Sequence, residues 1–175
     1  MFDFESRIVD IPDYPEPGVV FKDITPLFDD PVALRAAVKE IADHFRAAGV
    51  TKVVGPEARG FMMGTPVAYE LGAGFIPARK PGKLPRETVS ISYDLEYGSN
   101  VLEMHVDAIK PGDKVLIVDD LIATGGTAAA AGKLIGEMGG ELIGYGVLLE
   151  LCFLKPREAL AKTGDQELFS LVKVE

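Results

Sequence analysis

The chain has 175 residues, with 18 basic and 27 acidic side chains and a formal net charge of −9. Hydrophobic residues make up 47% and charged residues 26%, which is typical of a globular domain and excludes disordered and collagen-like proteins. The single cysteine excludes an internal disulfide framework. The chain starts with acidic residues, and no apolar run approaches a membrane span of about 20 residues. We therefore expect a cytoplasmic protein, with no membrane partner and, because of its negative charge, no nucleic-acid partner.

The first half of the chain carries alternating helix and strand signals. Residues 4–11 form a short amphipathic segment, and prolines and a glycine then indicate turns up to residue 18. Asp30 followed by Pro31 is typical of a helix start, and apolar residues at helical spacing predict a helix that ends at Gly49. Beyond it, the pattern predicts a strand at 51–55, a helix at 65–71 and a strand at 74–79.

The second half begins with alternating apolar and polar residues at 88–93 and 101–106, which predict a hairpin. The remaining predicted elements are a strand at 114–118, a helix at 127–138, a strand at 142–151, a short helix at 156–162 and a strand at 168–172. This order predicts an α/β fold with a mainly parallel central sheet flanked by helices. We expect a single domain over residues 1–175, with a small hood built from the terminal segments 1–30 and about 150–175.

The segment 115–127 carries the strongest chemical signal. A hydrophobic strand leads to Asp119 and Asp120, and a Thr-Gly-Gly-Thr turn at 124–127 then opens a helix. Ligands in open α/β sheets bind beyond the carboxyl ends of the strands, and backbone N–H groups at a helix start bind phosphate. Paired carboxylates beside such a site could hold sugar hydroxyls or a hydrated magnesium ion. The alternative is a helix cap followed by an ordinary loop.

Residues 115–127 resemble the phosphoribosyl-diphosphate motif of type I phosphoribosyltransferases. Four further segments narrow the resemblance to the members that use adenine, namely residues 17–24, 57–61, 79–85 and 93–98. The resemblance implies the type I phosphoribosyltransferase fold, with a hood that binds the base, and it implies purine salvage. The expected reaction transfers the 5-phosphoribosyl group from 5-phosphoribosyl 1-diphosphate to adenine, gives AMP and diphosphate, and uses Mg²⁺.

The resemblance also implies a role for each matching residue. Asp119 and Asp120 would hold the ribose hydroxyls, directly or through metal-bound water, and no direct metal ligand is expected. The adenine contacts would come from Val20, Phe21 and Lys22. The phosphate groups would lie on two turns, one at Glu57, Ala58 and Arg59 for the diphosphate, with a cis peptide at Glu57–Ala58, and one at Ala123, Thr124, Gly125, Gly126 and Thr127 for the 5′-phosphate.

A basic segment and a glutamate also fit this reaction. Residues 79–86 contain Arg79, Lys80, Lys83 and Arg86 without an acid, and such positive charge can neutralise a departing diphosphate. The alternative is a solvated loop. Glu96 is the candidate catalytic acid or base at the imidazole edge of adenine, while a lone glutamate in a turn is more often a surface residue. The family expectation is a homodimer in which Arg79 approaches the partner's site.

Three other functions compete with this interpretation. A P-loop triphosphatase is disfavoured, because five residues rather than four separate Gly126 from Gly132, and Leu134 replaces the serine or threonine of that motif. A transferase for xanthine or hypoxanthine would share the phosphate motif and differ in the base pocket. A regulator that keeps the fold as a sensor should carry an added basic segment for DNA, which we do not expect in this chain.

Overall fold

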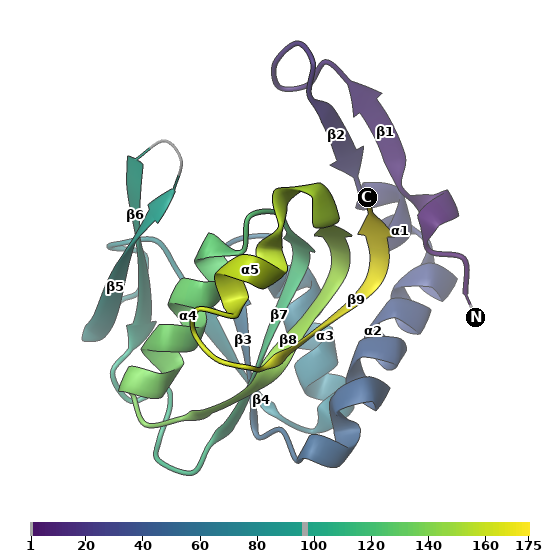
Figure 1. Ribbon diagram of the computed structural model, residues 1–175. Helices are drawn as coiled ribbons and strands as arrows, with labels where there is room; N and C mark the ends of the chain where they lie inside the picture. The colour runs from purple at the N-terminus through teal and green to yellow at the C-terminus, as the bar shows by residue number, and fades with distance from the viewer. Residues whose placement is uncertain (1, 96–97) are drawn as a thin grey trace.

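The computed structural model describes residues 2–95 and 98–175, and its centre is a parallel five-stranded sheet (Figure 1). The strand order is β4–β3–β7–β8–β9, and every neighbouring pair is parallel. These strands are β3 (Lys52–Pro56), β4 (Gly74–Ala78), β7 (Lys114–Ile122), β8 (Glu141–Leu151) and β9 (Glu167–Val174). The prediction of an α/β fold with a mainly parallel sheet is confirmed.

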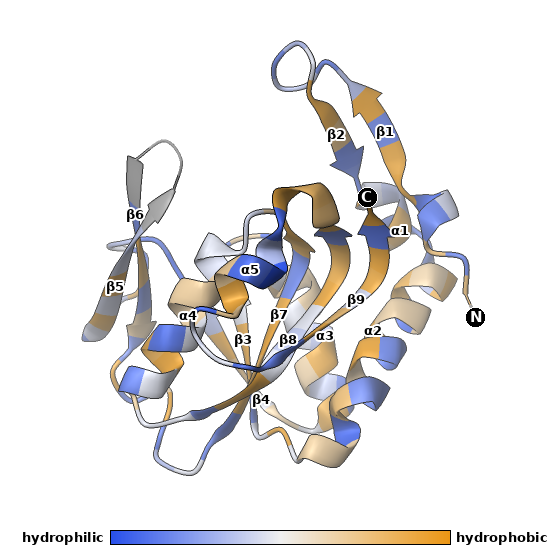
Figure 2. Ribbon diagram, viewed as in Figure 1, coloured by the Kyte–Doolittle hydropathy of each residue, from blue (hydrophilic) through white to orange (hydrophobic). Residues whose placement is uncertain are grey.

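Helices cover both faces of this sheet, because its strands carry apolar side chains on alternate sides. Val53, Leu116 and Val118 face the core beneath α2 (Pro31–Phe45) and α3 (Gly60–Leu71). Their sequence neighbours belong to a second core beneath α4 (Gly126–Glu137) and α5 (Pro156–Leu160), which includes Val54, Val115 and Ile117. Figure 2 shows the central strands largely in the hydrophobic colour. No helix in the described part of the chain has the length and apolar character needed to cross a membrane.

Two antiparallel hairpins stand apart from the central sheet (Figure 1). The first pairs β1 (Val9–Pro12) with β2 (Val20–Asp23), between a short 3₁₀ helix, Glu5–Arg7, and α1 (Thr25–Asp29). The second pairs β5 (Thr88–Leu95) with β6 (Gly98–His105). The first hairpin projects from the central sheet, and β9 is an edge strand of that sheet. A base-binding hood built from residues 1–30 and about 150–175 stays a prediction.

Most predicted elements are present, and the differences have local causes. Asp30 caps α2 as predicted, since its side chain accepts hydrogen bonds from the N–H groups of Val32 and Ala33. Helix α3 begins at Gly60 rather than at residue 65, because its start has no side-chain cap that a sequence pattern could reveal. Strand β7 continues to Ile122 because β8 pairs with it up to Glu150. The β1–β2 pairing was missed among the prolines.

Candidate active site

A cleft of about 260 Å³ lies where β3 and β7 end and α4 begins. It is lined by three groups that the sequence predicted separately: the turn at residues 57–59, the acidic pair Asp119 and Asp120, and the loop at residues 123–127. The cleft therefore lies at the carboxyl edge of a parallel sheet, where α/β proteins bind ligands. The predicted residues of β2 and of the basic loop do not line it.

The cleft opens because β3 and β7 separate before they end. Their pairing stops at Val54 and Ile117, whereas β3 stays paired with β4 up to Pro56 and Ala78. The N–H of Glu57 donates to the Ala78 carbonyl at 2.8 Å, so the nitrogen of the preceding residue, Pro56, faces β7. A proline has no N–H to continue a ladder. Beyond Val54 the space between the two strands is therefore free for a ligand.

Gly60 fits tightly between Pro56 and Asp119, at the first residue of α3. A Cβ at this position would lie 2.8 Å from Asp119 Oδ1 and 2.9 Å from Pro56 Cδ. Asp119 Oδ1 also accepts a hydrogen bond from the Asp120 N–H at 2.8 Å. The absence of a side chain at Gly60 thus allows the helix start to approach the acidic pair, and the hydrogen bond from the Asp120 N–H orients the Asp119 carboxylate.

The two adjacent acids differ in their surroundings. Asp120 is 2% exposed, and its Oδ2 lies 2.8 Å from Arg59 Nε. This contact is an ion pair whose geometry does not make a hydrogen bond, and Asp120 Oδ2 has no hydrogen-bond partner among the described residues. Burial, with the neighbouring charge of Asp120 as the second cause, raises the pKa of Asp119 well above its ordinary value. Both carboxylates are therefore suited to bind a ligand that brings positive charge or hydroxyl donors.

Magnesium is compatible with this pair of acids. Mg²⁺ is usually held by one or two carboxylates together with waters and substrate phosphates. Asp120 Oδ2 provides one such oxygen, next to the carboxylate of Asp119; it is buried, has no hydrogen bond among the described residues and is paired with Arg59. Within residues 2–95 and 98–175, no group of three or more His, Cys, Asp or Glu side chains could hold a metal ion. The acidic pair therefore supplies at most part of the oxygen ligands that Mg²⁺ needs.

The loop at residues 123–127 leads into α4 without a side-chain cap. Gly125, the N-cap residue, has a φ of 83°, a conformation that glycine adopts without strain. Since no side chain caps this helix start, the first N–H groups of α4 are left for another acceptor. A phosphate group is the ligand that such an arrangement favours. The loop at residues 123–127 thus lies beside the acidic pair in one cleft, and its role as a phosphate site stays a prediction.

The basic loop is bonded to the turn at residues 57–59. Arg79 Nε and Nη2 each donate to the Glu57 carboxylate at 3.1 Å, and the Lys80 N–H donates to it at 3.0 Å. Arg79 also donates to the Lys83 carbonyl at 3.1 Å. The hydrogen bonds from Arg79 and then Lys80 hold the pKa of Glu57 below its ordinary value. The Glu57–Ala58 peptide is cis, as the family resemblance implied.

The residues expected to contact adenine lie on β2 in the first hairpin. Val20 is 51% exposed, and the ring of Phe21 meets Tyr14 edge-on at 5.3 Å between centroids. Lys22 Nζ is paired with Asp10 at 2.6 Å. These residues therefore lie on the hairpin and do not line the cleft. Glu96, the expected acid or base, lies outside the described residues.

Two tyrosines join the site without having been predicted. Tyr93 on β5 places its hydroxyl 3.1 Å from Thr127 Oγ1, which connects the second hairpin to the phosphate loop. Tyr145 on β8 lines the cleft, and its hydroxyl lies 3.4 Å from Thr163 Oγ1. Both residues come from strands that the sequence did predict. Their contacts span 34 and 18 residues, so no local pattern could have indicated them.

Comparison with known proteins agrees with this geometry. Residues 27–173 match the phosphoribosyl transferase domain family. The chain is 56% identical over 171 residues to the adenine phosphoribosyltransferase of Lactobacillus johnsonii, covering 98% of this chain and 96% of that protein. It is 58% identical over 170 residues to the adenine phosphoribosyltransferase of Thermobifida fusca, covering 97% and 95%.

Solved structures give the same result. The crystal structure of adenine phosphoribosyltransferase from Thermoanaerobacter pseudethanolicus superimposes with a TM-score of 0.92 at 45% identity, covering 98% of each chain. The Saccharomyces cerevisiae enzyme, complexed with an imino-altritol bisphosphate and adenine, gives a TM-score of 0.89 at 38% identity, covering 97% and 96%. With a matching domain over most of its length and relatives above 50% identity, the chain belongs to the adenine phosphoribosyltransferase family.

Proposed function

We propose that the cleft transfers the 5-phosphoribosyl group of 5-phosphoribosyl 1-diphosphate to adenine, with AMP and diphosphate as products. One observation carries this proposal: the acidic pair, the phosphate loop and the turn at residues 57–59 line one cleft. These three groups match a ribose, a 5′-phosphate and a diphosphate, which are the three parts of the donor substrate. A site for a simple phosphate ester would need only the first two.

The donor is held by backbone and carboxylate groups. The N–H groups of residues 123–127 bind the 5′-phosphate, and Asp119 and Asp120 accept hydrogen bonds from the ribose 2′- and 3′-hydroxyls. Asp119 and Asp120 would hold Mg²⁺ through water, and the ion, when bound, neutralises part of the diphosphate charge. The backbone of the turn at residues 57–59 faces the diphosphate, because the Glu57 carboxylate is already bonded to Arg79 and Lys80.

The reaction breaks the bond between the ribose anomeric carbon and the diphosphate and forms a bond from that carbon to a ring nitrogen of adenine. Positive charge develops on the sugar, and negative charge develops on the departing diphosphate. Arg59 and the basic loop, including Lys80 and Lys83, stabilise the leaving group. Glu96 accepts the proton that the imidazole edge of adenine loses. This role of Glu96 rests on the family resemblance.

Base choice belongs to the hood in this proposal. Backbone groups around Val20, Phe21 and Lys22 read the edge of adenine, which offers a 6-amino donor and an N1 acceptor. Hypoxanthine reverses the polarity of both groups. Each unmatched buried polar group costs about 1–3 kcal/mol, so two reversals predict a preference for adenine of roughly 10²–10⁴-fold.

A competition assay tests the proposal directly. Equal adenine and hypoxanthine are incubated with limiting 5-phosphoribosyl 1-diphosphate and Mg²⁺, and the nucleotides are separated by chromatography. AMP should be nearly the only nucleotide formed. Comparable yields of AMP and inosine monophosphate would contradict the adenine assignment and leave a broader phosphoribosyltransferase. No nucleotide from any purine base would reject the enzyme.

A homodimer and a cytoplasmic location complete the proposal. Support for a dimer comes from the exposed apolar side chains of Val32 on α2 and Tyr69 on α3, which are 64% and 87% exposed. A groove of about 460 Å³ between these helices includes Tyr69 and Pro66. Light scattering after size-exclusion chromatography measures the mass, and a monomer at micromolar concentration would reject the dimer. Cell fractionation tests the location.

A further inference from the structure

Glu150 is a buried acid that the proposed reaction does not use. It lies near the end of β8, its side chain is 1% exposed, and it does not line the cleft. A buried carboxylate is costly unless it is paired and hydrogen-bonded. The Glu150 carboxylate therefore needs donors that offset the cost of its burial.

Two neighbouring elements bind the Glu150 carboxylate. Arg157 of α5 donates to both oxygens, from Nε to Oε1 at 2.8 Å and from Nη2 to Oε2 at 2.7 Å. Ser170 of β9 donates its hydroxyl to Oε2. Burial acts to raise the pKa of Glu150, but the hydrogen bonds from Arg157 and Ser170 outweigh it and hold the pKa below its ordinary value. The carboxylate is therefore ionised and makes a two-bond contact with Arg157, a geometry that fixes orientation.

The helix that carries Arg157 lies directly against the phosphate loop. A Cβ at Gly125 would be 2.9 Å from the Pro156 carbonyl oxygen and 3.3 Å from Ala159 Cβ. Helix α5 has only five residues and no side-chain cap, so it has little stability of its own. One side of α5 thus supports Gly125, and Arg157 ties the helix to the sheet at Glu150.

We propose that Glu150 and Arg157 are a positioning pair that holds α5 behind Gly125 and so keeps the loop at residues 123–127 shaped for the 5′-phosphate. This inference rests on the proposed function, because it assigns the loop to the phosphate of the donor. The pair touches no substrate. It acts through the backbone contact between Pro156 and Gly125.

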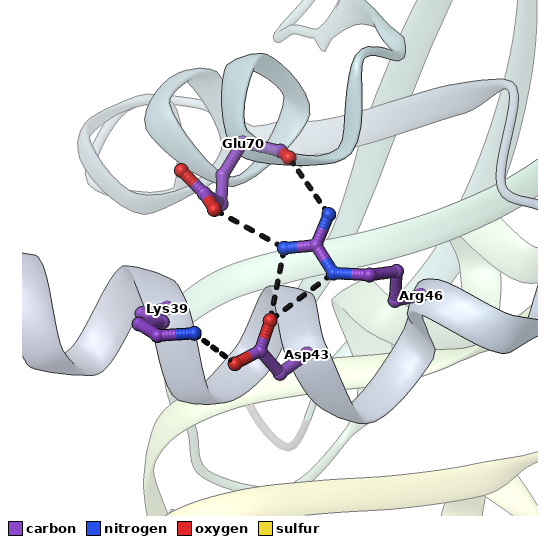
Figure 3. A network of polar contacts seen from close by, with 4 residues as sticks. All are labelled: Lys39, Asp43, Arg46 and Glu70. Atoms are coloured by element: carbon purple, nitrogen blue, oxygen red, sulfur yellow. Dashed lines mark hydrogen bonds and ion pairs between the residues drawn. The ribbon is translucent and has the colours of Figure 1, made fainter.

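A matched control is available at the opposite end of the molecule. Arg46 is 49% exposed, against 48% for Arg157, and it donates to Asp43 and Glu70 (Figure 3). Glu70 lies in the last turn of α3, whose first residue, Gly60, is at the cleft. Loss of Arg46 therefore removes ionic hydrogen bonds far from the phosphate loop, to acids that are 44% and 41% exposed.

The experiment compares Arg157→Gln, Glu150→Gln, their double variant and the control Arg46→Gln. Calorimetry measures the affinity of each for AMP and for adenosine, which lacks the 5′-phosphate. We expect Arg157→Gln and Glu150→Gln to weaken AMP binding by about 10- to 100-fold, the range that misplacement of a binding group produces. Adenosine affinity should stay within about two-fold, because only the phosphate contact is affected. The double variant should be no worse than either single variant, since the pair acts as one unit.

Melting temperatures separate this role from a structural one. Arg46→Gln should melt lower than the parent protein and keep its AMP affinity. AMP affinity that is unchanged in Arg157→Gln, or that falls together with adenosine affinity, would overturn the inference. If the glutamine variants do not fold, Arg157→Lys keeps the charge but not the two-bond geometry. The inference then predicts weaker AMP binding and unchanged adenosine affinity for Arg157→Lys. A parent protein without transferase activity would instead reject the proposed function.

Discussion

Gly60→Ala is the substitution for which the structure gives the sharpest expectation. The new methyl carbon would lie 2.8 Å from Asp119 Oδ1, 3.3 Å from Asp119 Cγ and 2.9 Å from Pro56 Cδ. Carbon contacts are optimal at about 3.5–4.0 Å, so these atoms must separate by roughly 0.6 Å or more. Pro56 is held in β3 by its pairing with β4. The Asp119 carboxylate must therefore move and lose its hydrogen bond from the Asp120 N–H.

The expected loss of stability is small, and the expected loss of activity is large. Overpacking costs about 1–3 kcal/mol, and alanine in a helix recovers about 0.5–1 kcal/mol relative to glycine. The net loss is about 0–2.5 kcal/mol, which corresponds to a fall in Tm of at most roughly 10 °C for a chain of this size. Displacement of a positioning group by about 1 Å costs on the order of 10²-fold in rate. We therefore expect kcat/KM for the phosphoribosyl donor to fall about 10²-fold.

The assay is a donor titration at saturating adenine, combined with thermal unfolding. Gly64→Ala is the matched control, because its Cβ would lie 2.8 Å from Phe75 Cε2, in the same helix but away from the acids. That variant should lose a similar amount of stability and keep its kcat/KM. If Gly60→Ala folds and retains the kcat/KM of the parent protein, the position of the Asp119 carboxylate does not matter for the reaction.

Four further predictions concern single residues. Glu96→Gln should lower kcat by roughly 10²–10⁴-fold and change KM less, and unchanged turnover would make Glu96 a surface residue. Lys83→Ala should weaken diphosphate binding by roughly two- to five-fold and reduce its salt dependence, as measured by titration at two ionic strengths. The pKa of Asp119 is raised above 3.8 in the folded protein, so ionisation of its carboxyl lowers the free energy of unfolding as pH rises above that value. Asp119→Asn should therefore lose activity but melt at a higher temperature than the parent protein at pH 7. The difference in Tm should shrink toward about pH 4. Tyr93→Phe removes the hydroxyl that contacts Thr127 and should lower kcat/KM for the donor by roughly two- to ten-fold. Unchanged kinetics would show that this contact does not contribute to the reaction.

The sequence predicted the parts of the site that are contiguous in the chain. Asp119, Asp120 and the loop that follows them lie on one strand–turn–helix segment, so hydrophobic pattern and turn residues were sufficient to locate them. The β–α alternation was equally local, and it predicted the sheet. The hood residues were indicated only by family resemblance, because periodicity carries no information about a base.

The parts that escaped prediction are contacts between distant segments. The hydrogen bonds between the Glu57 carboxylate and Arg79, 22 residues further along the chain, were not predicted. Glu150 is a polar residue within the strand predicted at 142–151, and its partner Arg157 follows only after a turn. Such pairings depend on how elements pack in three dimensions. A single sequence shows which charges exist but not which of them meet.

The width of the cleft depends on a hydrogen atom that Pro56 does not have. Any other residue at this position would present an N–H toward β7, where the ladder now stops at Val54 and Ile117. That N–H could donate one further backbone hydrogen bond from β3 to β7 and so narrow the cleft between the ends of the two strands. A change at residue 56 can therefore alter the room for the diphosphate through the main chain alone, even when the new side chain is small and apolar. In this part of the protein, the missing backbone N–H of Pro56 helps to set the size of the cleft.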